Sequence, residues 1–497
     1  METMITSKIL LPVLLPMLTA MAVMASGARP NLRESFSLAG AVLTFISVAL
    51  LLPHILKGGS YAYTFFELWP GISVKLHIDA LGLLFAGTAS FLWILAAIYC
   101  IGYMRGLNEH AQTRFYVCYA VSVGAALGGA FSGSLFTLYL FYEIVSIFTY
   151  PLVMHHQDEE GYAGARQYIV YLMFTSKAFL LPAMAIIYVQ CGTLDFAAGS
   201  IASGIFPADA SRFLVGVSYI LLFFGFAKAG VMPLHSWLPS AMVAPTPVSA
   251  LLHAVVVVKI GVFSVCRIML SVYGVDLLAD TGLGLITAYF VSFTIITASA
   301  IALTKTNLKA RLAYSTVSQL SYIILGVALL TPNGITGGLI HIANHGFAKI
   351  TLFFAAGCIF VATQKKDIRE MAGLGFAMPL TMLAFGLASL SMIGVPPVSG
   401  FVSKWYLALG TMDINNLILL TVLLVSSLLN AGYFVPVVLT AFFGKPEDGG
   451  GGPSGVRMLE TRPLILLMVI PLCITAAISV LIGIRPDLLL TLVHLLM

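Results

Sequence analysis

The sequence predicts an all-α polytopic membrane protein, on three observations of composition and patterning. Of its 497 residues, 60% are apolar and 9% carry a formal charge, whereas soluble domains average about 25% charged residues. The mean hydropathy is +1.01, so the chain contains too much apolar surface to remain disordered. Its apolar runs extend for about 20 positions, the length of a spanning helix, and lack the alternation of a membrane β-barrel.

The spans follow from dividing the chain at its charges and at its clusters of Gly, Pro and Asn. This division predicts about fourteen transmembrane helices, at 8–27, 36–56, 79–103, 113–132, 134–154, 165–190, 212–240, 245–272, 281–303, 310–331, 335–362, 377–410, 415–443 and 463–485. The first run also has features of a signal peptide with a small-residue cleavage site. We expect a retained first helix, because the run is long and many spans follow it.

Spans 7 and 12, at 212–240 and 377–410, are too long for one straight helix. Each contains helix-breaking residues near its middle: Gly230 and Pro233 in the first, and Gly394, Pro396, Pro397 and Gly400 in the second. Broken backbone at membrane depth persists only where protein or a wet cavity covers it. In transporters, broken helices mark the ion or substrate site. A packing kink explains one break, but two matched breaks favour a functional role.

The distribution of Lys and Arg predicts the orientation of the chain. Loops after odd-numbered spans carry 14 of these residues, and the loops and tails on the other side carry 6. Positive loops remain in the cytoplasm, so both termini are predicted outside the inner (plasma) membrane. The loop PEDGGGGPSG at 446–455 is expected to be a flexible cytoplasmic linker.

Once the Lys and Arg assigned to loops are set aside, five lysines and one acid are left inside the membrane: Lys177, Lys228, Lys259, Lys349, Lys404 and Glu143. Such groups are costly in a bilayer, so they face a bundle interior and are usually functional. Snorkelling to the interface is the alternative for Lys177 and Lys404. Burial disfavours a charged ammonium and a nearby carboxylate favours it. A buried Glu143–Lys228 pair, direct or bridged by water, would therefore act as a proton switch.

Histidines fall in the same regions of the chain. His253 lies six residues before Lys259, and His341, His345 and Lys349 recur every four residues, so these three share one helix face. This spacing also occurs in zinc sites, but no carboxylate or thiol follows on that face and Lys349 would repel a cation. We expect a proton relay or a satisfied polar stripe there and no metal, and the six scattered cysteines indicate no ligand set either.

Five segments resemble the antiporter-like subunits of respiratory complex I, of Mrp-type Na+/H+ antiporters and of membrane-bound hydrogenases. They are LYLFYEIVSIFTYPLV at 138–153, FAKAGVMPLHSWLPSAMVAPTPVSALLHAVVVVKIGVF at 226–263, TKTNLKARLAYSTVSQLSYIILG at 304–326, HIANHGFAKITLFFAAG at 341–357 and GVPPVSGFVSKWY at 394–406. The resemblance implies two inverted five-helix repeats with helices 7 and 12 broken. It divides the chain into helices 1–3 (1–112), a first repeat of helices 4–8 (113–272), a second repeat of helices 9–13 (281–443), and a linker with helix 14 (444–497).

The resemblance also implies a row of proton-transfer residues. Glu143 and Lys228 match the paired glutamate and lysine on helices 5 and 7, and Lys404 matches the terminal group on helix 12. The family's relay between this pair and the terminal group is matched by five residues, His253, Lys259, His341, His345 and Lys349. Lysine at position 404 favours a protein similar to the D-type member of Mrp antiporters or to the hydrogenase-type subunits. Lys177 departs from the family pattern, but by the symmetry of the two repeats it corresponds to Lys349, which suggests a further relay position.

The leading hypothesis is therefore a subunit of a multisubunit membrane complex that moves H+, alone or against Na+, along this row. The alternative is the proton-pumping membrane subunit of a redox-driven complex, a complex I-like oxidoreductase or a membrane-bound hydrogenase. The chain has no cysteine cluster, haem motif or nucleotide loop, so we expect no cofactor in it. The expected partners are other membrane subunits and the lipid bilayer, and a net charge of +5 spread over short loops gives no nucleic-acid surface.

Overall fold

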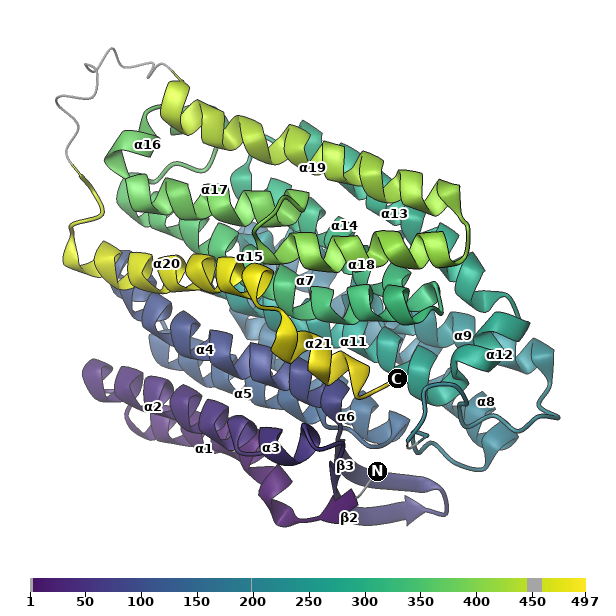
Figure 1. Ribbon diagram of the computed structural model, residues 1–497. Helices are drawn as coiled ribbons and strands as arrows, with labels where there is room; N and C mark the ends of the chain where they lie inside the picture. Colours follow the sequence, from purple (N-terminus) through teal and green to yellow (C-terminus); the bar gives the residue numbers. More distant parts are fainter. Residues whose placement is uncertain (1–2, 198, 445–457) are drawn as a thin grey trace.

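A computed structural model describes residues 3–197, 199–444 and 458–497, and shows long helices packed side by side (Figure 1). Ten helices of this described part are long and apolar enough to cross a membrane, at Ser7–Ala25, Pro30–Ile55, Ala80–Gly106, Leu135–Val153, Glu159–Cys191, Val248–Tyr273, Leu283–Thr304, Pro332–Thr363, Leu417–Phe443 and Pro463–Ile484. The predicted helical membrane class is confirmed. The count of fourteen stays a prediction, and the linker at 446–455 lies outside the described residues.

The N-terminal part combines helices with a small sheet that the sequence did not predict. Its elements are β1 (Thr3–Ile5), η1 (Ser7–Leu10), α1 (Leu11–Ala25), α2 (Pro30–Ala49), α3 (Leu52–Ile55), β2 (Ser60–Trp69), β3 (Ile72–Ile78) and α4 (Ala80–Gly106). Strand β1 pairs in parallel with β2, and β2 pairs antiparallel with β3. Asp79 ends the hairpin and begins α4, because its carboxylate accepts a hydrogen bond from the Gly82 amide at 2.9 Å.

The next elements contain several turns of wide π-helix. They are α5 (Gln112–Ala130), α6 (Leu135–Val153), α7 (Glu159–Thr175), η2 (Ser176–Leu180), α8 (Leu181–Cys191), α9 (Arg212–Gly225), η3 (Ala227–Ala229), α10 (Trp237–Ser240), η4 (Ala241–Val243), η5 (Val248–Val256), α11 (Val257–Ile268), η6 (Met269–Tyr273) and α12 (Val275–Asp280). Segments η2, η5 and η6 are π-helical. Turns of this kind are rare and occur often at functional sites.

The remaining elements are more regular. They are α13 (Leu283–Thr304), α14 (Leu308–Ala328), α15 (Pro332–Thr363), η7 (Ile368–Met371), α16 (Leu374–Ala377), α17 (Pro379–Ile393), α18 (Ser399–Asp413), α19 (Leu417–Phe443), α20 (Pro463–Ile484) and α21 (Asp487–His494). Helix α15 lies in the middle of the bundle, and all its residues from 334 to 359 are buried. The run from η5 to η6 is buried along its whole length. These two segments therefore form the interior that holds the candidate site.

Both predicted helix breaks are confirmed. Helix α9 ends before η3, and the chain then leaves the helix at Gly230, whose φ is +69°. Helix α17 ends at Gly394, whose φ is +92°, and α18 begins at Ser399. Glycine adopts these left-handed angles without a Cβ penalty. The prolines that follow each glycine lack an amide donor, so the helix cannot continue directly.

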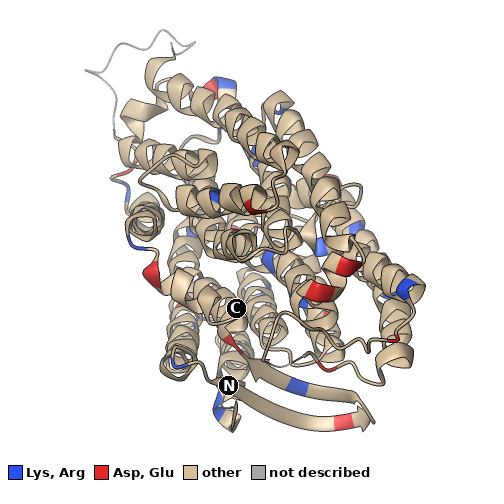
Figure 2. Cartoon of the chain, turned by 45° about the vertical axis from the view of Figure 1, so that its right-hand side comes forward, with Lys and Arg blue, Asp and Glu red and all other residues tan. Residues whose placement is uncertain are grey.

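The loops after predicted spans 5, 7, 9 and 11 lie together at one end of the bundle, which we call the basic end. Residues from these four loops line one cavity of about 320 Å³, among them His156, Met242, Lys309 and Lys365. Figure 2 shows that charged residues form only scattered bands on a largely uncharged ribbon. The few charges inside the bundle therefore stand out as candidates for function.

Candidate functional site

The carboxylate of Glu143 on α6 is paired with Lys177, not with Lys228. Its Oε2 contacts Lys177 Nζ in an ion pair. Lys177 belongs to the π-helical segment η2, and 47% of its side chain is exposed on the described chain, against 12% for Glu143. The predicted direct ion pair between Glu143 and Lys228 is therefore wrong. The wide turn of η2 presents Lys177 to α6, which helical spacing alone did not indicate.

Lys228 is held by neutral groups on either side of Glu143. It is completely buried on η3, and its Nζ donates to the Tyr142 carbonyl at 2.7 Å and to Ser146 Oγ at 2.6 Å. The Nζ lies 3.1 Å from the centre of the Tyr142 ring, where the ring quadrupole attracts a cation. Lys228 is thus bound to the residue just before Glu143 without touching the carboxylate. The water-bridged alternative for this pair stays a prediction.

A second contact joins the two buried central segments. Lys259 on α11 points to His345 on α15, and its Nζ contacts the ring Nδ1. Both residues are at most 1% exposed. His253, on the π-helical segment η5, is not part of this contact: neither ring nitrogen has a partner among the described residues. The rings of Tyr168 and Trp237 lie 6.1 and 6.2 Å from it.

Farther along the same face of α15, neutral side chains hold the remaining histidine. His341 Nδ1 lies 2.7 Å from Ser403 Oγ, and its Nε2 lies 3.0 Å from Gln319 Oε1. The rings of His341 and His345 are stacked with centres 5.8 Å apart. Both nitrogens of His341 are therefore engaged in hydrogen bonds and not directed at a shared ligand position.

A continuous hydrogen-bonded chain connects Lys349 with Lys404. Lys349 Nζ donates to Ser315 Oγ at 2.9 Å, and the Tyr433 hydroxyl donates to the same oxygen at 3.2 Å and contacts the Asn430 amide oxygen. Asn430 Nδ2 donates to the Met392 carbonyl at 3.1 Å. Lys404 Nζ donates to that same carbonyl at 2.8 Å.

The helix break explains how Lys404 is held without an acid. Its Nζ also donates to the Ile393 carbonyl at 3.0 Å and to Ser427 Oγ at 3.1 Å. Met392 and Ile393 are the last residues of α17, whose carbonyls have no intrahelical partner and form the negative end of the helix dipole. Ending α17 at Gly394 thus creates the acceptors for Lys404.

Two glycines provide room for the lysines at the breaks. A Cβ on Gly261 of α11 would overlap the backbone of Lys228 and Ala229, so this glycine lets η3 lie directly against α11. A Cβ on Gly394 would lie 2.6 Å from Lys404 Cδ. Each glycine therefore sets the position of a lysine side chain, and neither role was predicted from the sequence.

The neutral members of the site were also missed by the sequence analysis. They are Tyr142, Ser146, Ser315, Gln319, Ser403, Asn430 and Tyr433. Serine, tyrosine and asparagine occur widely in the spans, so no pattern distinguishes these from the others. The one available signal is local, since Tyr142 directly precedes Glu143 and Ser146 lies one turn later.

Comparison with known proteins decides the family. The family described as "NADH:quinone oxidoreductase/Mrp antiporter, TM" matches residues 132–430. The chain belongs to this family. NADH-quinone oxidoreductase subunit N of Desulforudis audaxviator is 31% identical over 484 residues, which cover 94% of this chain and 93% of that protein. A Na(+)/H(+) antiporter subunit of Alkalihalophilus pseudofirmus is 33% identical, but the match covers 67% of this chain and only 42% of that longer protein.

Two solved structures share the fold along almost the whole antiporter-like chain. A chain of the Mrp complex from Dietzia sp. DQ12-45-1b superposes with a TM-score of 0.86 at 24% identity, covering 99% of this chain and 97% of that one. A chain of the membrane-bound sulfane sulfur reductase, an archaeal respiratory membrane complex, gives a TM-score of 0.85 at 25% identity, covering 98% and 96%. The polytopic antiporter-like architecture is thus shared from end to end.

Proposed function

We propose that this chain is a proton-translocating subunit of a multisubunit membrane complex, moving H+ alone or against Na+. The observation that carries the proposal is the hydrogen-bonded chain from Lys349 through Tyr433 to Lys404. The hydroxyls of Ser315 and Tyr433 can each accept one proton and release another. The Asn430 amide and the Met392 carbonyl cannot, so they hold the two ends in position and transfer between them needs water. A structural scaffold would gain nothing from a lysine at each end of such a chain within a membrane bundle.

The proposed path has three parts. The carboxylate of Glu143 exchanges its contact between Lys177 and Lys228, so that Lys228 holds a proton when the acid is near and releases it when the acid turns away. The contact between Lys259 and His345 crosses the interior, with His253 and His341 beside it. Lys349 then passes the proton towards Lys404. Arginine could not replace these lysines, because it does not release its proton at neutral pH.

Lys404→Arg in the assembled complex is the decisive test. Lys404 is only partly buried and its Nζ meets two carbonyls and one hydroxyl, acceptors that also suit a guanidinium. We expect the variant to assemble normally and to lose proton translocation in proteoliposomes loaded with a pH-sensitive dye. Wild-type translocation by an assembled Lys404→Arg complex would reduce this lysine to a fixed charge and refute the relay.

A redox-driven complex is the second candidate, and the near end-to-end match to an NADH-quinone oxidoreductase subunit N favours it. The two candidates differ in what drives proton movement. In proteoliposomes, an antiporter responds to an imposed Na+ gradient without an electron donor, whereas a redox-driven pump needs a donor and a quinone. Under either candidate the chain expressed alone is expected to show little transport, because the partner subunits complete the path.

The proposal includes the plasma membrane as the location, with both termini outside and the basic end in the cytoplasm. We also propose that the chain divides into residues 1–112, two inverted repeats at 113–272 and 281–443, and residues 444–497. Cysteines introduced at Lys365 and at Lys57 test the orientation with a membrane-impermeant thiol reagent. We expect labelling of Lys365→Cys only in inside-out vesicles and of Lys57→Cys only in intact cells. Labelling of both from the same side would contradict the proposed topology.

A further inference from the structure

A cluster of histidines and one acid lies at the basic end, apart from the lysine row. Glu109 and His110 belong to the loop between α4 and α5, and His155 and His156 belong to the loop between α6 and α7. One ligand atom from each of Glu109, His110 and His155 lies within 4.8 Å of the others. The rings of His110 and His155 are stacked with their centres 4.8 Å apart.

The distances from Glu109 to His155 and to His156 fit shared coordination better than direct hydrogen bonding. Glu109 Oε2 lies 3.5 Å from His155 Nε2 and 3.6 Å from His156 Nδ1. Hydrogen bonds from a ring nitrogen to a carboxylate are typically shorter, about 2.7–3.2 Å. Two ligand atoms that each lie about 2.0–2.1 Å from one tetrahedral Zn²⁺ are roughly 3.4 Å apart.

His155 supplies an independent observation. Its side chain is completely buried, and neither of its ring nitrogens has a hydrogen-bond partner among the described residues. A buried polar atom without a partner costs about 1–3 kcal/mol. A bound ion would give this side chain a partner, and its ring lies against His110 and near Glu109.

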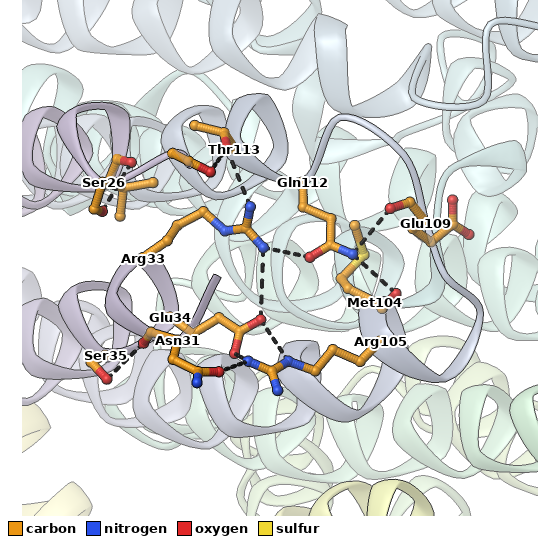
Figure 3. Close-up of polar contacts among 12 residues, drawn as sticks. Ser26, Asn31, Arg33, Glu34, Ser35, Met104, Arg105, Glu109, Gln112 and Thr113 are labelled. Carbon is orange, nitrogen blue, oxygen red and sulfur yellow. Dashed lines mark hydrogen bonds and ion pairs between the residues drawn. The ribbon is translucent and has the colours of Figure 1, made fainter. Parts of the chain in front are cut away.

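The two loops are held in place independently of any ligand. Gln112 Nε2 donates to the carbonyls of Met104 at 3.3 Å and Glu109 at 3.0 Å, and its Oε1 accepts from Arg33 at 2.5 Å (Figure 3). On the other loop, Arg114 donates to the His155 carbonyl at 3.2 Å. The candidate ligands thus belong to loops whose backbone is fixed by hydrogen bonds, which lowers the conformational entropy lost when an ion binds.

We propose that Glu109, His110 and His155 bind a Zn²⁺ ion, with water or His156 in the fourth position. Imidazole and carboxylate ligands without a thiol suit Zn²⁺ and neighbouring borderline metals, and three protein ligands with one open position form a recurring zinc geometry. The ion would link the α4–α5 loop to the α6–α7 loop. Because His156 also lines the cavity at the basic end, the bound metal would hold the mouth of that cavity in one conformation.

The test uses the purified complex that contains the full chain, freed of metal with a chelator and titrated with Co²⁺ and then Zn²⁺. We expect one Co²⁺ per chain with the intense visible absorption of a tetrahedral site, and its displacement by Zn²⁺. His110→Ala is the main variant, because this ring is exposed and its loss removes the stacking on His155 without emptying a buried site. We expect it to weaken Zn²⁺ binding at least tenfold, and Glu109→Gln to do the same.

His494→Ala is the matched control, since His494 is also exposed but lies at the end of α21. We expect it to bind Zn²⁺ as the wild type does. Hydrogen exchange gives a second readout: Zn²⁺ should slow exchange in both loops of the wild type and in neither loop of His110→Ala. Absence of Co²⁺ and Zn²⁺ binding in the wild type, or equal binding by His110→Ala, would overturn the proposal.

Discussion

The part of the bundle that holds Glu143, Lys177 and Lys228 (the first half) and the part that holds Lys349 and Lys404 (the second half) differ in the charge that lies beside their lysines. In the first half, Glu143 contacts Lys177 and lies next to the residue that binds Lys228. In the second half, Lys349 and Lys404 donate only to hydroxyls and backbone carbonyls among the described residues. Lys228 is held by a carbonyl and a hydroxyl, as Lys349 and Lys404 are, so the difference is the full negative charge that the first half adds beside its lysines.

This difference shows that a broken helix can take the place of an acid. The free carbonyls at the end of α17 carry partial negative charge and are fixed by the fold, so they cannot move away from Lys404. A carboxylate on a side chain can turn between two partners. The first half is accordingly suited to switching, and the second half to passing a proton along a fixed chain.

The largest expected effect is on transport, from Lys228→Met in the first half. Methionine keeps much of the length and apolar stem but removes the Nζ that binds Tyr142 and Ser146. We expect proton translocation in proteoliposomes to fall to background while the complex still assembles. Lys228→Arg is a poorer probe, because the Nζ already lies 3.1 Å from the centre of the Tyr142 ring and a guanidinium is larger.

Lys57→Met is the control for this variant, since it removes a lysine from a loop outside the row. We expect it to transport at the wild-type rate. If Lys228→Met retained transport while Lys404→Met lost it, the switch would have to be placed in the second half.

Gly261→Ala is expected to have the next largest effect. The new Cβ would overlap backbone atoms of Lys228 and Ala229, which cannot move as a flexible side chain could. Overpacking of this kind typically costs about 1–3 kcal/mol, and here it would also displace Lys228. We expect a lower melting temperature of the complex and a large loss of transport. Gly386→Ala, in α17 with open space around it, should leave both unchanged.

The fold could be predicted largely from lengths of apolar sequence. Helices α4, α5 and α6 lie within three residues of the predicted spans at both ends, and both breaks occur at the predicted glycines. The hairpin of β2 and β3 was missed because it is short and lies between two long apolar runs that predict helices. Three of its large side chains, Phe65, Phe66 and Trp69, are exposed. Short strands give a much weaker pattern than a run of 20 apolar residues.

The candidate site was predictable only in its charged members. A charge in an apolar run is visible because it is costly, so all six ionisable positions could be named. The sequence did not identify Lys177 as the partner of Glu143, because the π-helical turn at Lys177 depends on local backbone geometry that the sequence does not reveal. The sequence also did not identify the residues that connect the lysines, which are Ser315, Asn430 and Tyr433. Such residues carry no charge and occur throughout the spans.

A smaller effect is expected for the ion pair itself. Lys177 is half exposed on the isolated chain, but it lies in the candidate span Glu159–Cys191, where water does not screen the pair as it does at a soluble surface. A double-mutant cycle of Glu143→Gln and Lys177→Gln, followed by thermal unfolding of the complex, should give a coupling energy of about 0.5–3 kcal/mol. We expect Glu143→Gln to impair transport far more than Lys177→Gln. Equal losses would show that Lys177 and not Lys228 is the partner that matters for switching.

The smallest expected effect comes from one hydroxyl in the second half, with Tyr433→Phe. The ring still fills its buried site, but the links to Ser315 and Asn430 are lost. A neutral hydrogen bond contributes about 1 kcal/mol, which corresponds to roughly a fivefold change in rate when it stabilises the rate-limiting step. We therefore expect transport to slow about fivefold without a change in assembly.

Tyr406→Phe on α18 is the matched control, because the Tyr406 hydroxyl makes no side-chain hydrogen bond among the described residues. Its transport rate should equal that of the wild type. A fixed relay predicts that Tyr433→Phe also raises the solvent deuterium isotope effect on transport, since proton transfer along the chain becomes slower than the other steps. If Tyr433→Phe slows transport no more than Tyr406→Phe, protons bypass this chain. The second half would then act through the charge of its lysines alone.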